Sequence, residues 1–279
     1  MNNKICIIIG CFKNHKVVNN IYNFIKNITN NFDFYVVNNN IKIHKQIINE
    51  YSDNFIVIEG DNSSYEFSGI QKCLDIIDKT KYSLFILGTD ALFNHPIEYL
   101  DFINLDMIEY SMNNECFIGN IDSFFKNYVI DDFTVNYWIR TSFIFINSNL
   151  FKKINYQFIT YNYKDIFDEE ENIKIKIDQE LLNFLKNWLK KDRYKYINNI
   201  NIKINCIINE WKLTNKLVKH GKIFDYTNIY LLYFHESIIT KNNKMILLNN
   251  HNYVQYPIIT KIEKHNWMEQ LKLKNNLLK

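Results

Sequence analysis

Several residue types that often mark a function are scarce in this chain of 279 residues. It has 6 glycines and 2 prolines, and arginine occurs only at Arg140 and Arg193. The formal net charge is +3, and no basic stripe interleaved with aromatics is present, which argues against nucleic acid as a partner. No apolar run approaches the roughly 20 residues of a transmembrane helix. We therefore expect a soluble, cytoplasmic protein.

The cysteines also exclude some classes of protein. They are odd in number and include no CxxC pair, which indicates free thiols in a reducing compartment rather than a disulfide framework or a zinc site. The apolar run Ile5–Phe12 is short and lacks a small-residue cleavage site after it, so it predicts a first strand rather than a signal peptide.

Two common nucleotide-binding motifs are missing. The segment after the first predicted strand reads Gly10-Cys-Phe-Lys-Asn, which is not GxGxxG, and no GxxxxGK[ST] occurs anywhere. These absences disfavour a dinucleotide-dependent dehydrogenase and a P-loop enzyme.

The first 93 residues alternate between short apolar runs and segments of helical periodicity. Strands are predicted over 4–9, 34–37, 55–58 and 83–87, and helices over 15–28, 41–51 and 65–77. Repeated strand–helix alternation is typical of a parallel sheet with right-handed crossovers. We therefore predict an α/β fold whose mostly parallel sheet is flanked by helices.

In such a sheet the carboxyl ends of all parallel strands meet at one edge, where open α/β sheets bind ligands. Polar residues or glycine follow each predicted strand: 10–13, 38–40, 60–62 and 88–90. Asp90 is a lone carboxylate directly after the most apolar strand, and Gly88 ends that run. These residues predict a ligand site at the edge.

The second half is less regular. A strand is predicted over 138–146, helices over 96–105, 177–189 and 210–219, and a late strand over 229–234, while 194–208 alternates only weakly. The tail 263–279 has the pattern of a basic amphipathic helix that docks on the domain or lies on an anionic membrane surface. No repeat or linker divides the chain, so we expect a single domain over 1–279.

Some of these segments resemble a known family. Asp61-Asn-Ser-Ser-Tyr-Glu-Phe-Ser-Gly-Ile-Gln-Lys-Cys-Leu74, followed by Tyr82-Ser-Leu-Phe-Ile-Leu-Gly-Thr-Asp90, resembles the core of GT-A fold glycosyltransferases. Trp138–Phe151, Asp178-Gln-Glu180-Leu-Leu and Asn209–Gly221 are similar to segments of polysaccharide and rhamnan-synthesis enzymes. The acidic DXD motif of that family is reduced here to Thr89-Asp90-Ala91, with Gly88 in place of the first acid.

The resemblance implies a GT-A, Rossmann-like domain with a nucleotide-binding half (1–93) and a mixed acceptor-side half (94–279). It implies a hexosyltransferase that moves a sugar from a nucleotide-sugar donor to a glycan or another hydroxyl acceptor, inverting or retaining. The donor site would use the following residues: Cys11, Asn38, Asp61, Gly69, Thr89 and Asp90. From the residues alone, Asp61 is equally explained as a helix N-cap.

The catalytic residues implied are Glu180, Asp178 and Arg140. Glu180, Asp178 or Asp132 would accept the acceptor's proton, with Glu180 favoured. A divalent cation, Mn²⁺ or Mg²⁺, held by Asp90 and His235 would neutralise the leaving diphosphate. Without a metal, Arg140 or a lysine would have to supply that charge.

For Asp178 and Glu180 the ordinary alternative is placement at the positive end of a helix dipole. Two other functions also stay open. One is a non-catalytic binding protein with the same fold, and the other is a nucleotidyltransferase that makes the sugar nucleotide. The second would need a Gly- and Arg/Lys-rich loop after the first strand, which this chain lacks.

Overall fold

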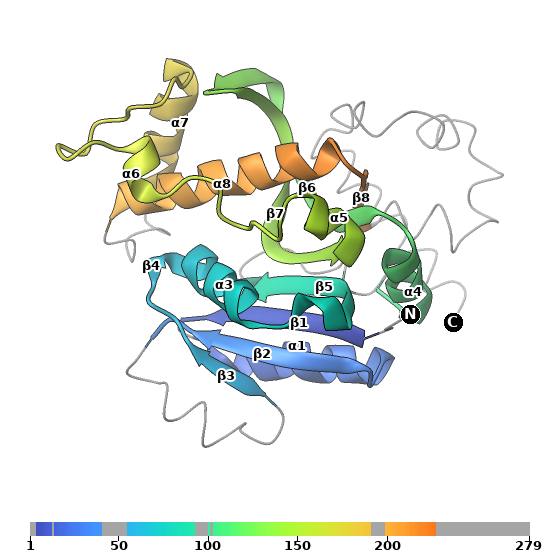
Figure 1. Cartoon of the computed structure of the whole chain (residues 1–279). Coiled ribbons are helices and arrows are strands. Elements are labelled where there is room, and N and C mark those ends of the chain that lie inside the picture. The colour runs from blue at the N-terminus through green and yellow to red at the C-terminus, as the bar shows by residue number, and fades with distance from the viewer. Residues whose placement is uncertain are drawn as a thin grey trace, which may run out of the picture.

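The computed structural model describes residues 4–12, 14–40, 55–92, 100, 103–190 and 199–226. Within them the chain forms a seven-stranded mixed sheet in the order β3-β2-β1-β5-β7-β6-β8, with helices packed on both faces (Figure 1). The predicted helix 41–51, the late strand 229–234 and the tail helix 263–279 lie outside the described residues, as does most of the predicted helix 96–105.

The first half of the sheet is parallel, as the alternation predicted. Its strands are β1 (Lys4–Cys11), β2 (Phe32–Asn38), β3 (Ile56–Glu59) and β5 (Tyr82–Thr89). β1 pairs in parallel with both β2 and β5, and β2 pairs in parallel with β3. The two-residue strand β4 (Ser63–Ser64) lies outside this sheet.

The second half makes the sheet mixed. β6 (Cys116–Ile130) and β7 (Phe133–Asn147) form a long antiparallel hairpin, and β7 pairs antiparallel with β5. β8 (Lys222–Asp225) then pairs in parallel with β6. The fold class is therefore confirmed at the level of an α/β protein with a mostly parallel, mixed sheet flanked by helices.

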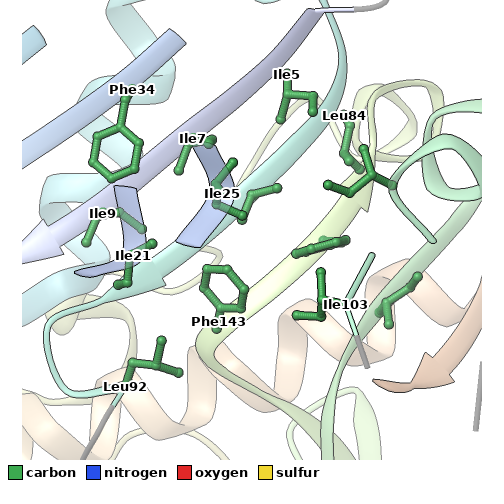
Figure 2. Close-up of a cluster of buried hydrophobic side chains, with 14 of the residues drawn as sticks. Ile5, Ile7, Ile9, Ile21, Ile25, Phe34, Leu84, Leu92, Ile103 and Phe143 are labelled. Atoms are coloured by element: carbon green, nitrogen blue, oxygen red, sulfur yellow. The ribbon is translucent and has the colours of Figure 1, made fainter. Parts of the chain in front are cut away.

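One face of the sheet is covered by α1 (His15–Ile28) and α4 (Leu105–Asn113). The odd-numbered residues of β1 point to this face, since side chains alternate along a strand. Figure 2 shows Ile5, Ile7 and Ile9 packed with Ile21 and Ile25 of α1. Every labelled side chain there is apolar and buried, so this face is held by hydrophobic burial.

The opposite face is covered by α3 (Tyr65–Ile76), α5 (Ser148–Lys153) and the long α8 (Ile200–Val218). Cys6 and Ile8, the even-numbered positions of β1, point to this face. The remaining helical segments are a 3₁₀ turn (Lys79–Lys81), α6 (Tyr163–Ile166) and α7 (Gln179–Leu189).

α8 packs on two sides. Cys206, Leu213 and Leu217 contact the sheet-side core. Ile204, Ile208 and other apolar residues of α8 pack with residues of α7 and of the β6–β7 hairpin in a separate core cluster. Figure 1 shows α7 and the hairpin beside α8. None of the described helices is long and apolar enough to cross a membrane.

Candidate functional site

The carboxyl ends of β1, β2, β3 and β5 lie at one edge of the sheet, which we call the carboxyl edge. The register places Cys11 beside Asn38, and Asn38 beside Glu59. It also places Gly10 beside Thr89. Because β8 runs in the same direction, it ends at this edge too. The residues that sequence reasoning assigned to a donor site after these strands therefore share one side of the molecule.

Asp90 follows β5 and is tied to the loop between β1 and α1. Its backbone N–H donates to the carbonyl of Gly10 at 2.9 Å. Its carboxylate Oδ2 accepts hydrogen bonds from the backbone N–H groups of Phe12 at 3.0 Å and Asn14 at 2.8 Å. Unpaired N–H groups and the helix dipole favour an anion at the start of a helix. Asp90 thus places a negative charge beside the start of α1, where it binds the N–H groups of the loop residue Phe12 and of the N-cap residue Asn14.

Cys11 and Asn38 are buried side by side at the same edge. The Sγ of Cys11 lies 3.9 Å from the Asp90 carboxylate. Burial and the charge of Asp90 raise the pKa of the Cys11 thiol far above its ordinary value, so it stays protonated. The Oδ1 of Asn38 accepts from the backbone N–H of Asn40 at 3.0 Å, but its Nδ2 has no hydrogen-bond partner among the described residues. A buried amide donor without a partner is costly, and a ligand acceptor would satisfy it.

Thr89 and Gly88 precede Asp90 and are also buried. The Thr89 hydroxyl accepts from the backbone N–H of Ala91 at 3.2 Å, which shapes the turn. A Cβ on Gly88 would lie 3.0 Å from the Phe143 ring and 3.1 Å from Ile9. The position at which the resemblance expects a first acid therefore faces apolar core and leaves little room for a larger side chain.

Gly69 lies where α3 crosses β2. A Cβ at this position would lie 2.7 Å from both Asn39 Oδ1 and Val37 Cγ1. The glycine therefore permits close packing between the helix and the sheet. The role of Gly69 in binding the nucleotide-sugar donor stays a prediction, because its close neighbours are Asn39 and Val37 of the protein itself.

Asp61 follows β3 and is exposed. Its Oδ1 accepts from the backbone N–H of Ser63 at 2.9 Å and from the Ser63 hydroxyl at 3.0 Å. Burial raises the pKa of Asp61, but hydrogen bonds from Ser63 and Ser68 outweigh it, so the net shift is downward. The carboxylate organises the turn that leads into α3, close to the capping role considered from the sequence, although the residue at the N-cap itself is Ser64.

A group of charged side chains surrounds the point where α8 passes the carboxyl edge. We call it the edge cluster. Its charged members come from α3, β6, β7 and α8, and the neutral Thr141 of β7 joins them through its hydrogen bonds: Glu66, Asp122, Arg140, Lys203, Glu210 and Thr141. Glu66 packs against Gly10 of β1, since a Cβ on that glycine would lie 3.2 Å from the Glu66 Cβ. Thr141 lies two residues before Phe143, which pairs with Gly88. The cluster is therefore level with the strand ends.

The edge cluster is built from paired charges. The Lys203 ammonium lies 3.2 Å from Glu66, and the Nε of Arg140 donates to Asp122 at 3.1 Å. Burial lowers the pKa of Lys203, but the negative charge of Glu66 and Glu210 outweighs it and the net shift is upward. Both cations are thus held by carboxylates of the protein, including Arg140, which sequence reasoning assigned to catalysis.

Among the carboxylates of the edge cluster, Glu210 is the one least stabilised by a neighbouring cation. Its Oε1 accepts from the backbone N–H of Thr141 at 2.6 Å and from the Thr141 hydroxyl at 2.9 Å. Burial raises the pKa of Glu210 above its ordinary value, only partly offset by these hydrogen bonds and by the charges of Lys203 and Arg140. A carboxylate with a raised pKa is better suited to accept a proton near neutral pH.

Glu180 and Asp178 lie elsewhere, at the start of α7. Asp178 is the N-cap of that helix, and its Oδ1 accepts from the backbone N–H of Glu180 at 2.9 Å. Glu180 forms an ion pair with Lys126 and accepts from the Tyr128 hydroxyl at 3.2 Å. The Lys126 hydrogen bond holds the pKa of Glu180 below its ordinary range. These contacts match the helix-start alternative, and the catalytic roles of both residues stay predictions.

Of the two predicted metal ligands, only Asp90 lies among the described residues. His235 lies outside the described residues, and Asp90 is at the carboxyl edge. Within the described ranges no three His, Cys, Asp or Glu side chains converge as a metal site. Magnesium is often held by one or two carboxylates with substrate phosphates completing its shell, so Asp90 is compatible with a cation that arrives with a diphosphate.

Sequence reasoning missed the edge cluster because its pairs are distant along the chain. Lys203 and Glu66 are 137 positions apart, and Thr141 and Glu210 are 69 apart. Apart from Arg140, to which the resemblance gave a catalytic role, the charged residues of the cluster look like ordinary surface charges in the sequence. No protein-family model matches this chain, and neither does any curated protein.

Proposed function

We propose that this protein is a glycosyltransferase that moves a sugar from a nucleotide-sugar donor to a hydroxyl acceptor, with the donor at the carboxyl edge. The observation that carries the proposal is the buried Nδ2 of Asn38, which has no hydrogen-bond partner among the described residues. Asn38 lies beside Cys11, whose thiol contacts the Asp90 carboxylate. A nucleotide offers carbonyl, ring-nitrogen and hydroxyl acceptors for such a donor. The parallel first half and mixed second half of the sheet agree with a GT-A domain and support this assignment.

The charges at the edge indicate how the diphosphate would be held. Asp90 already binds the N–H groups of Phe12 and Asn14 just before α1, and the two cations of the edge cluster are held by Glu66 and Asp122. Bringing a diphosphate to an edge rich in carboxylates costs free energy unless positive charge accompanies it. Asp90 would hold a divalent cation, which would act as a Lewis acid that neutralises the departing diphosphate.

Glu210 is our choice for the group that accepts the acceptor hydroxyl's proton. It lies level with the strand ends, it has a raised pKa, and its second oxygen is not used by Thr141. Glu180, the residue favoured from the sequence, is committed to Lys126 and has a lowered pKa. Glu210 of α8 therefore replaces Glu180 of α7 as the residue proposed to accept the proton.

A second candidate is a binding protein of the same fold that turns over no donor. It is favoured by the hydrogen bonds of Asp90, because a carboxylate that holds the β1–α1 loop has a sufficient structural role. The two candidates differ in catalysis and agree on nucleotide binding.

The test is release of nucleoside diphosphate from a panel of UDP-, GDP- and dTDP-sugars, with and without Mn²⁺. We expect one nucleotide class to be hydrolysed or transferred by the wild type. Glu210→Gln should reduce turnover strongly with little change in donor affinity, while the control Glu180→Gln should behave as wild type. Binding without turnover supports the second candidate, and the absence of binding to every nucleotide contradicts both.

A further inference from the structure

A cavity lies away from the carboxyl edge, between the turn of the β6–β7 hairpin and the end of α8. Its volume is about 450 Å³, and it is open to solvent. The residues that matter for its chemistry come from that turn, from β7 and from α8: Asp131, Asp132, Phe133, Thr134, Asn215 and Lys219. Small-molecule sites typically measure about 300–1,000 Å³, so the space suits a small ligand or one unit of a larger one.

The wall made by the hairpin turn is rigid. Asp131 has a left-handed backbone with φ 47°, and its N–H donates to the carbonyl of Lys176 at 2.6 Å. The Tyr161 hydroxyl lies 3.1 Å from the carboxylates of both Asp131 and Asp132. The buried Lys212 ammonium forms an ion pair with Asp132. A wall that is already ordered loses less entropy when a ligand binds.

The charges around the cavity nearly cancel. Asp131 and Asp132 are opposed by Lys219 in the lining and by Lys212 behind it. The hydrogen bond and charge of Lys212 hold the pKa of Asp132 below its ordinary range, so this carboxylate stays ionised. The aspartates would repel an anion and the lysines would repel a cation. The lining therefore favours a neutral ligand that both donates and accepts hydrogen bonds.

One oxygen in the lining of the cavity lacks a hydrogen-bond donor. The Oδ1 of Asn215 is buried and has no hydrogen-bond partner among the described residues. Native structures leave few buried polar atoms unpaired. A hydroxyl of a ligand would satisfy this oxygen, and the carboxylates and the Thr134 hydroxyl provide further partners. Val129, which also lines the cavity and is 42% exposed, adds an apolar surface suited to the C–H groups of a sugar ring.

We propose that this cavity, which we call the hairpin site, binds a neutral polyhydroxylated ligand, namely a sugar unit of a glycan. The site shares no lining residue with the carboxyl edge. Its binding does not depend on whether the protein transfers sugars.

Saturation-transfer difference NMR tests the proposal with a panel of free glucose, galactose, mannose, rhamnose and N-acetylglucosamine. We expect the wild type to transfer saturation to at least one of them. Asn215→Ala and Lys219→Ala should each weaken that binding by about three- to tenfold, the usual effect of one lost hydrogen bond. Thermal unfolding of each variant shows whether it still folds.

Two matched variants keep the result specific. Asn183→Ala removes an exposed amide from α7, and Asn38→Ala alters the carboxyl edge; both should leave sugar binding unchanged. The proposal is overturned if no sugar binds the wild type, or if Asn215→Ala and Lys219→Ala fold and bind like wild type. Loss of binding in Asn38→Ala alone would also overturn it, by assigning the sugar to the donor site. Failure of nucleotide binding in the separate donor assay leaves this result unaffected.

Discussion

Replacing Asp90 with alanine removes the carboxylate that joins the end of β5 to the start of α1. The variant loses the hydrogen bonds from the backbone N–H groups of Phe12 at 3.0 Å and Asn14 at 2.8 Å, and the weak one from the Cys11 thiol at 3.9 Å. Asp90→Asn keeps an oxygen that can accept from both groups and removes only the charge. Comparing the two variants separates the structural role of Asp90 from an electrostatic role toward a ligand.

A hydrogen bond to a charged group contributes about 1.5–3 kcal/mol when its partner is buried. Both N–H groups here are at exposed positions, so water replaces part of the loss. We therefore expect Asp90→Ala to lower the free energy of unfolding by about 2 kcal/mol in total, and Asp90→Asn by less than about 1 kcal/mol. At an m-value of about 2 kcal/mol per molar urea, the alanine variant should unfold at about 1 M lower urea.

Urea unfolding followed by circular dichroism measures both variants. Asp75→Ala is the matched control, since it removes an exposed carboxylate on α3 whose amide partner is Gln71 at 2.8 Å. Surface changes of that kind usually alter stability by less than about 0.5 kcal/mol. If Asp90→Ala were as stable as Asp75→Ala, the carboxylate would not hold the β1–α1 loop, and our account of the edge would need revision.

Three further predictions concern packing, protonation and the thiols. Gly69→Ala should lower the free energy of unfolding in urea by about 1 kcal/mol or more, because overpacking against Asn39 and Val37 outweighs the gain in helix propensity. A variant as stable as the wild type, or more stable, would show that α3 is not packed as described. The pKa of Glu210 in the folded protein lies above its ordinary value of 4.5, so the stability that Glu210 contributes is fully present below pH 4.5 and is lost as the pH rises through the folded pKa. Glu210→Gln should therefore flatten the pH dependence of the free energy of unfolding between these two pKa values. An unchanged pH profile would contradict the raised pKa. The five cysteines are free and buried, so a thiol reagent such as DTNB should label them slowly in the native protein and fully in denaturant; rapid native labelling would show that they are accessible.

Much of the first half of the sheet could be predicted from the sequence because β1, β2 and β5 are mostly buried and its strands end sharply. β1, β2, β3 and β5 each fall within two residues of the predicted bounds, and α1 matches at both ends. The edge position of Asp90 followed from that topology. Its hydrogen bonds to the β1–α1 loop did not, because backbone donors leave no signal in side-chain patterns.

α8 shows why the second half was harder. Residues 200–209 read Ile-Asn-Ile-Lys-Ile-Asn-Cys-Ile-Ile-Asn, an alternation closer to the period of a strand than to that of a helix. They are nevertheless helical, and the helix begins ten residues before the predicted start at 210. α8 is covered by the sheet on one side and by α7 and the hairpin on another, so apolar residues occur around much of its circumference.

Calorimetric titration with UDP, GDP and dTDP in the presence of Mn²⁺ tests directly whether the carboxyl edge binds a nucleotide. We predict that the wild type binds one of them, that Asn38→Ala weakens this binding by about tenfold through loss of the buried amide donor, and that Glu180→Gln on α7 leaves it unchanged. No binding by the folded wild type, or equal binding by Asn38→Ala, would contradict the account.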